Sequence, residues 1–170
     1  AIRDVPKPVI ARVQGFAIGG GNVLATICDL TICSDKAQFG QVGPKMGSVD
    51  PGYGTAFLAR VVGEKKAREI WYLNRRYSGA EAVAMGLANF CFPHDQLDAE
   101  VQKIGEELCE RSPTALAIAK RSFNADTAHQ AGIAGLGMYA LKLYYDTEEP
   151  REGVNALKDK RKPEFRKYVK

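Results

Sequence analysis

VIARVQGFAIGGGNVLATICDLTICS, residues 9–34, places three consecutive glycines between a strand-like run and a helix-like run. The segment opens with a β-branched run that follows two prolines, and it closes on a second apolar run, LTICS. The residues that follow the glycines have the spacing of a short helix. A strand, a glycine turn, a helix and another strand in succession are typical of an α/β fold, which we therefore predict.

Outward from this segment the chain soon becomes helical. We predict short strands at residues 37–41 and 88–93, and helices at residues 55–63, 64–74, 77–87, 97–110, 113–124, 127–145 and 152–160. The clearest helix starts are Ser78, which has Glu81 three residues later as in a capping box, and Ser112, which precedes Pro113. One short α/β segment cannot cover so many helices, so we expect a partner chain or preceding strands to complete the fold.

The composition is typical of a globular protein and argues against a membrane protein. Of the 170 residues, 45% are hydrophobic and 26% are charged, and no apolar run approaches the roughly 20 residues of a membrane span. The N-terminus has neither a secretory signal nor an initiator Met, so we expect a cytoplasmic chain that begins inside a longer protein. The cysteines form no C-x-x-C pair, and we expect reduced thiols and no metal site.

The net charge of +4 is concentrated at the C-terminus, in KDKRKPEFRKYVK, residues 158–170. Such a tail can bind nucleic acid, an acidic membrane surface or a phosphorylated small molecule, or it can simply be solvated. No RNA-binding signature or zinc-finger spacing accompanies the tail. We therefore expect no nucleic acid and no membrane among the partners.

A loop rich in glycine and proline, GPKMGSVDPGYG, covers residues 43–54 and contains Ser48 and Asp50. Serine and aspartate are ordinary turn residues, so the loop can be a simple connection. Alternatively, its glycines and prolines make a rigid frame that presents a hydroxyl and a carboxylate to a substrate.

The glycine triplet, Gly19 to Gly21, opens the first helix. Free backbone N–H groups at a helix N-terminus favour a phosphate or a developing oxyanion, and glycine also allows close packing of helix on strand. The spacings G-x-G-x-x-G and G-x-x-x-x-G-K-[ST] are absent. Nucleotide binding is therefore disfavoured, and an oxyanion donor is the sharper hypothesis.

Three segments together resemble the crotonase superfamily, the enoyl-CoA hydratases and isomerases. They are VQGFAIGGGNVLATICDLTICSDKAQFGQVGPKMGSVD, VGEKKAREIWYLNRRYSGAEAVAMGLAN and REGVNALKDKRKPEF. The resemblance implies the C-terminal portion of a ClpP-like β-β-α spiral. Residues 1–90 would belong to the spiral core, and residues 91–170 to a helical region that packs on the core and on neighbouring subunits of a homo-trimer or hexamer. The first part of such a protein supplies much of the CoA pocket and one of two oxyanion donors.

The resemblance also assigns the catalytic positions. The second oxyanion donor corresponds to the N–H of Gly20, the middle glycine. Hydratases of the superfamily carry two catalytic glutamates, and the matching positions here hold Val23 and Gly43. Without a carboxylate at either position, hydration of an enoyl-CoA has no obvious acid or base, so we expect different chemistry.

One branch of the superfamily, the 1,4-dihydroxy-2-naphthoyl-CoA synthases, has the pattern Q-x-G-P-K-x-G-S-x-D, which QVGPKMGSVD matches at residues 41–50. These enzymes also carry a tyrosine near the active site, before a T-E-E segment, and this position corresponds to Tyr145. Some members bind bicarbonate in place of the hydratase glutamate. The residues that match this pocket are Gln41, Gly43 and Trp71, although a tryptophan in a helix can equally be a core residue.

A still closer resemblance is to the 2-ketocyclohexanecarboxyl-CoA hydrolases, in GSVDPGYGTAFLARVVGEKKAREIWY and GMYALKLYYDT. It implies hydrolytic ring opening of an acyl-CoA substrate, 2-ketocyclohexanecarboxyl-CoA, to pimelyl-CoA in anaerobic benzoate degradation. Asp50 would orient or deprotonate the water, Ser48 would bind the ring ketone, and Tyr145 would donate or shuttle a proton. The phosphates and adenine of CoA would meet Lys160, Arg161 and Phe165. The synthase and a non-catalytic binding protein remain the alternatives.

Overall fold

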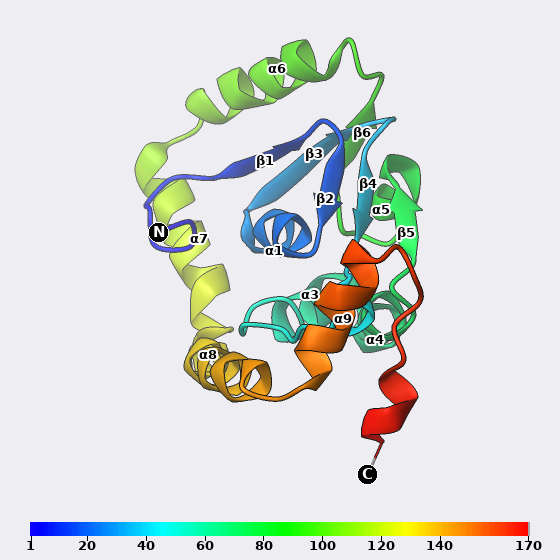
Figure 1. The fold of residues 1–170 in the computed structure, drawn as a ribbon. Coiled ribbons are helices and arrows are strands. Elements are labelled where there is room, and N and C mark those ends of the chain that lie inside the picture. Colours follow the sequence, from blue (N-terminus) through cyan, green and yellow to red (C-terminus); the bar gives the residue numbers. More distant parts are fainter. Residues whose placement is uncertain (170) are drawn as a thin grey trace.

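The computed structural model describes residues 1–169 and contains two small sheets (Figure 1). The first sheet has the order β1-β3-β6 and is parallel throughout, with strands Ile10–Val13, Leu30–Ser34 and Phe90–Phe92. The second sheet has the order β2-β4-β5, with strands Phe16–Ile18, Gln38–Gly40 and Arg76–Ser78. In it, β2 and β4 are parallel, and β5 is antiparallel to β4.

The first four strands alternate between the two sheets. The chain passes through β1, β2 and helix α1 (Gly20–Ile27), and then through β3, β4 and α2 (Gly43–Met46). Each of these two turns of the chain therefore adds one strand to each sheet before a helix, with Ile10 opposite Leu30 and Phe16 opposite Gln38. This β-β-α spiral confirms the predicted fold class.

The remaining helices surround these sheets. They are α3 (Ala56–Val62), α4 (Glu64–Leu73), α5 (Gly79–Ala84), α6 (Leu97–Cys109), α7 (Pro113–Ala125), α8 (Gly132–Tyr145) and α9 (Glu149–Lys158), with 3₁₀ turns η1 (Ala128–Gln130) and η2 (Phe165–Tyr168). In Figure 1, α6, α7 and α8 form an arc around the sheets, and α9 lies in front of α3 and α4. The core contains fully buried side chains of β3, β4, α3 and α4, namely Ile32, Phe39, Leu58 and Ile70.

Most predicted helix boundaries are confirmed, and the physical signals behind them are visible. Helix α3 ends before Gly63, whose φ of 79° favours glycine. At the start of α5, the Ser78 hydroxyl accepts from the Glu81 N–H at 3.3 Å, and the Glu81 carboxylate accepts from the Ser78 N–H at 2.7 Å. Ser112 caps α7 by accepting from the Ala115 N–H at 3.3 Å.

Four local predictions were wrong. The segment 127–145 is a 3₁₀ turn followed by α8, and the last helix begins at Glu149, three residues earlier than predicted. Strand β5 was missed, and its last two residues, Tyr77 and Ser78, were predicted as helix, because three residues are too few to show an alternation of their own. The loop that begins at Gly43 contains the short helix α2, although it was predicted without regular structure.

Several apolar side chains of the C-terminal helices are exposed. Ile118, Phe123, Leu136, Tyr139 and Leu143 all lie on α7 or α8 with more than half of their surface accessible. Strand β6, which begins at residue 90, belongs to the first sheet. The division at residue 90 and the homo-oligomer both stay predictions. Within residues 1–169, no helix combines the length and apolar character needed to cross a membrane.

Candidate active site

The loop of residues 43–54 is a rigid frame closed by Asp50. The carboxylate oxygen Oδ1 accepts hydrogen bonds from the backbone N–H groups of Gly52 at 3.0 Å and Gly54 at 2.8 Å. The other oxygen, Oδ2, accepts from the Thr55 hydroxyl at 2.7 Å. Two of these donors belong to the loop, and the third, Thr55, follows it directly. A carboxylate bound in this way fixes the conformation of the loop, which favours the frame over the simple connection.

The frame is clamped by close backbone contacts with α8. A Cβ placed on Gly137 would lie 2.5 Å from the carbonyl carbon of Pro51, and one placed on Gly52 would lie 2.3 Å from Ala134 Cα. Neither distance is possible for real atoms, so glycine is required at both positions. Helix α8 therefore keeps Gly137 despite the poor helix propensity of glycine.

Helix α9 clamps the start of the frame in the same way. A Cβ placed on Gly153 would lie 2.2 Å from the carbonyl oxygen of Met46, and one on Gly47 would lie 3.1 Å from Pro150 Cα. Gly47 also has a φ of 67°, which disfavours other residues. The frame is thus held between two helices that come from the far end of the sequence.

The structure brings Ser48 and Tyr145 together. The Ser48 hydroxyl and the Tyr145 hydroxyl are 3.0 Å apart, and either can be the donor. Tyr145 is the last residue of α8, and its side chain is 48% exposed. The clamp at Gly137, two helical turns earlier, places this tyrosine on the loop.

Asp50 lies beside the first turns of α1. A Cβ placed on Gly54 would lie 2.9 Å from Asp50 Oδ1 and 3.0 Å from Val23 Cγ2. The side chains of Asp50 and Val23 therefore both border Gly54 and lie close to each other. Gly20 is the first residue of α1, and its N–H has no intrahelical acceptor because of this position.

The residues predicted to hold bicarbonate are close together but already engaged. Trp71 Nε1 donates to the Gly54 carbonyl at 2.5 Å, and Gln41 Nε2 donates to Asn22 Oδ1 at 3.2 Å. The Trp71 ring also lies 3.0 Å from where a Gly43 Cβ would be, so the ring fills the space that a side chain there would need. Trp71 has no second N–H to offer. Binding of bicarbonate at these residues stays a prediction.

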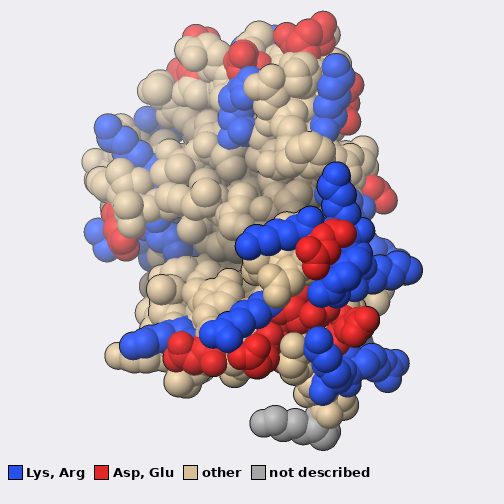
Figure 2. All heavy atoms as spheres, viewed as in Figure 1, with Lys and Arg blue, Asp and Glu red and all other residues tan. Residues whose placement is uncertain are grey.

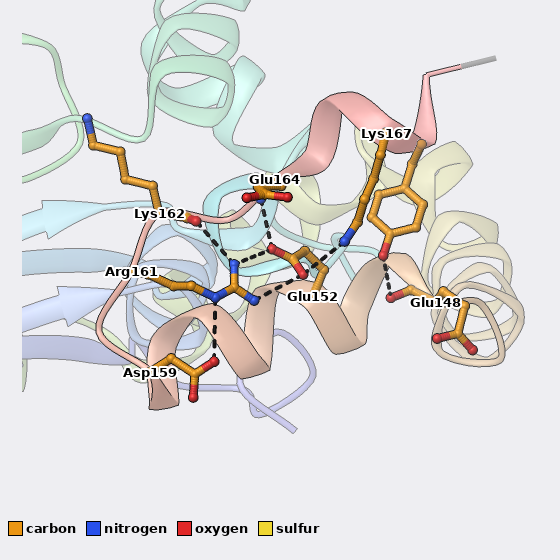
Figure 3. A network of polar contacts seen from close by, with 8 residues as sticks. Glu148, Glu152, Asp159, Arg161, Lys162, Glu164 and Lys167 are labelled. Carbon is orange, nitrogen blue, oxygen red and sulfur yellow. Dashed lines mark hydrogen bonds and ion pairs between the residues drawn. The ribbon is translucent and has the colours of Figure 1, made fainter.

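Arg161 holds the C-terminal segment in place (Figure 3). Its guanidinium donates to Glu152 at 2.6 and 3.2 Å, and Glu152 also accepts from the Glu164 N–H and from Lys167. Hydrogen bonding to Arg161 and to the Glu164 N–H lowers the pKa of Glu152 to about 2. The charge of Arg161 is therefore balanced within the chain.

The other two predicted CoA contacts differ in their surroundings. Lys160 is exposed, and its backbone has a φ of 53°. Phe165 lies in η2 and is half-buried. Figure 2 shows that charged side chains of both signs gather where α9 and the C-terminal segment lie, whereas the centre of this face is largely uncharged. Among residues 1–169, no hydrogen bond or ion pair joins these three residues to Ser48 or Tyr145.

Comparison with known proteins places the chain in a family. The profile described as enoyl-CoA hydratase/isomerase matches residues 1–168. The chain belongs to the enoyl-CoA hydratase/isomerase family. Members of this family generally act on CoA thioesters.

Solved structures of this family agree with the fold. An enoyl-CoA hydratase from Mycobacterium avium subsp. paratuberculosis K-10 is 31% identical, with a TM-score of 0.92 over 96% of this chain and 67% of that one. An enoyl-CoA hydratase/isomerase from Pseudoalteromonas atlantica T6c is 26% identical, with a TM-score of 0.91 over 96% of this chain and 66% of that one. A carnitinyl-CoA hydratase from Mycobacterium avium is 25% identical, with a TM-score of 0.89 over 96% and 65%. The chain thus spans about two thirds of the length of these family members.

Several residues of this family member were missed by sequence reasoning. Asn22 is fully buried, accepts from Gln41, and leaves its Nδ2 without a partner among residues 1–169. Gly137 and Gly153 clamp the loop, and neither was assigned a role at the site from the sequence. Small-residue contacts between distant segments leave no local signal in a sequence. Within the same residues, no group of three or more His, Cys, Asp or Glu side chains has the arrangement of a metal site.

Proposed function

We propose that the protein opens the ring of 2-ketocyclohexanecarboxyl-CoA by hydrolysis of a C–C bond and produces pimelyl-CoA. The observation that carries this proposal is the pairing of Ser48 with Tyr145 at 3.0 Å, on a loop whose Asp50 lies beside Val23. The hydratase glutamate position is occupied by valine, and a carboxylate approaches the same place from another segment. The chain spans about two thirds of its relatives, so the activity is proposed for the complete polypeptide.

The reaction begins with attack of water on the ring ketone. The bond between the ketone carbon and the α-carbon of the thioester then breaks, and its electron pair becomes the thioester enolate. The Gly20 N–H, at the start of α1, would donate to the enolate oxygen. Removing one donor of this kind typically costs about 2.7–4 kcal/mol of barrier.

Asp50 would orient the attacking water and accept the proton that the water loses; this proton restores the hydroxyl that protonates the α-carbon. A carboxylate has about four lone-pair sites, and Asp50 already accepts three hydrogen bonds, from Gly52, Gly54 and Thr55. The remaining site can accept a hydrogen bond from water. Ser48 would donate to the ketone oxygen, and Tyr145, which contacts Ser48, would pass a proton to the α-carbon of the enolate.

The second candidate is a 1,4-dihydroxy-2-naphthoyl-CoA synthase, whose loop pattern matches residues 41–50. A Claisen-type condensation would use the same oxyanion donor and the same pair of hydroxyls, because it forms the type of C–C bond that the hydrolase would break and passes through the same kind of enolate. The third candidate is a non-catalytic member of the family that binds CoA. Turnover of one acyl-CoA and not the other separates the first two candidates, and binding without turnover favours the third.

The test is an incubation with 2-ketocyclohexanecarboxyl-CoA followed by mass analysis of the acyl-CoA products. It should use the chain as given and also a polypeptide of the relatives' full length. A product heavier by one water from the full-length polypeptide supports the hydrolase. No product from that polypeptide contradicts the hydrolase and favours the assay for naphthoyl-CoA synthesis.

A further inference from the structure

Two cysteines lie side by side on neighbouring strands, outside the candidate active site. Cys33 on β3 and Cys91 on β6 are directly paired in the register of the first sheet. The Cys33 thiol is fully buried and donates to the carbonyl of Phe90 at 3.4 Å. Cys91 is half-buried, and both cysteines are free thiols.

The position of Gly79 shows that both sulfur atoms point to one place. A Cβ placed on Gly79 would lie 2.8 Å from Cys91 Sγ and 3.0 Å from Cys33 Sγ, so the two sulfur atoms are at most 5.8 Å apart. Glycine at this position leaves room for both thiols.

The backbone separation also suits a disulfide. Neighbouring strands lie about 4.7–4.9 Å apart, and the Cα atoms of disulfides are usually about 4.4–6.8 Å apart. Strand β6 has three residues and lies at the edge of its sheet, where β3 is its one partner among residues 1–169. A short edge strand can shift enough to bring the two sulfur atoms into bonding distance.

We propose that Cys33 and Cys91 form an intramolecular disulfide when the protein meets a hydroperoxide. Cys91 is the more accessible thiol, so its sulfur attacks the peroxide first. The S–O bond forms as the O–O bond breaks, and hydrogen peroxide releases one water. The Cys33 sulfur then attacks the Cys91 sulfur, the S–S bond forms, and a second water leaves. The two thiols lose two electrons and two protons, and the peroxide is reduced.

The buried position of Cys33 shapes the rate of the second step. Burial and the neighbouring Cys91 raise the pKa of Cys33 to about 12. Because the thiolate is the attacking form, closure of the disulfide should become faster as the pH rises towards this value. A sulfenic acid on Cys91 without this partner would persist longer, and only an excess of peroxide would oxidise it to the sulfinic acid.

The test uses the double variant Cys28→Ser/Cys109→Ser, which keeps only this pair of thiols. The variant is treated with hydrogen peroxide, denatured in acid, labelled with a thiol-alkylating reagent and analysed as intact protein and as peptides. The expected result is a monomer that lacks two hydrogens, takes up no label and yields a peptide that joins Cys33 to Cys91. Two labelled thiols after treatment, a sulfinic acid on Cys91, or a cross-linked dimer would each overturn the proposal.

Single replacements on the same background provide the controls. With Cys33→Ala, peroxide should leave a sulfenic acid on Cys91 that dimedone traps, and with Cys91→Ala the loss of two hydrogens should disappear. Far-UV circular dichroism verifies that each variant is folded before treatment. If dimedone traps as much sulfenic acid in the background protein as in Cys33→Ala, Cys33 does not attack Cys91 and the proposal is wrong.

Discussion

Replacement of Gly137 by alanine tests the clamp between α8 and the loop. An alanine Cβ at this position would lie 2.5 Å from the Pro51 carbonyl carbon and 2.6 Å from the Gly52 nitrogen. Ordinary contacts between such atoms begin near 3.4 Å, so a backbone must move by most of an ångström. Overpacking of this kind costs about 1–3 kcal/mol. Alanine also returns about 1 kcal/mol of helix propensity, which offsets part of the cost.

Gly135→Ala is the matched control, because Gly135 lies on the same helix with open space around its Cα. The propensity gain is common to both variants and cancels in the comparison. Gly137→Ala should therefore be less stable than Gly135→Ala by about 1–3 kcal/mol, measured by urea unfolding followed by circular dichroism. Turnover by the full-length polypeptide should fall only in Gly137→Ala, because the Ser48–Tyr145 contact depends on the clamp. Equal stabilities and equal turnover numbers in the two variants would show that the close contact of Gly137 with the loop neither stabilises the fold nor positions Tyr145.

Three further predictions concern single side chains. The pKa of Glu152 is lowered to about 2, so its ion pairs stabilise the fold above the ordinary glutamate pKa, and this contribution is lost as the pH falls towards 2. Glu152→Gln should therefore flatten the decline of the free energy of unfolding that is measured from pH 5 downward. An unchanged decline would contradict the role of these ion pairs. Lys120 is buried and donates to the carbonyls of Ile2 and Lys7 and to Asp29. Lys120→Met should lower the free energy of unfolding by about 1–3 kcal/mol, because it leaves these acceptors without a donor. Thermal melts that coincide with those of the parent protein would argue against this role of Lys120. Tyr145→Phe removes only a hydroxyl from an exposed side chain, so the free energy of unfolding should not change, whereas kcat should fall by a factor of about 100 or more. Retention of normal kcat would exclude the proton-transfer role of Tyr145.

The fold could be predicted where the signal is local. Ser78 and Glu81 form a capping box within four residues, and Gly63 ends a helix through its own φ. By contrast, β5 is a strand because it pairs with β4, and nothing within Arg76–Ser78 shows that partner. Tyr77 and Ser78 were therefore assigned to the helix that follows.

The candidate site could be located but not assembled from the sequence. The spacing of Ser48 and Asp50 pointed to this loop, and the resemblance added Tyr145 from a position 97 residues away. The hydrogen bonds that occupy Trp71 and Arg161 could not be predicted, because their acceptors come from other elements of the fold. The sequence shows which groups are present, whereas the packing determines which of them remain free.

The central claim is that water cleaves a C–C bond of a β-keto acyl-CoA at the site of Ser48, Asp50 and Tyr145. The most direct measurement is an incubation of the full-length polypeptide with 2-ketocyclohexanecarboxyl-CoA in H₂¹⁸O, followed by mass spectrometry of the acyl-CoA. If water cleaves this bond, we expect pimelyl-CoA with one heavy oxygen in its new carboxylate. Unchanged substrate, or free CoA released by cleavage of the thioester without ring opening, would contradict it.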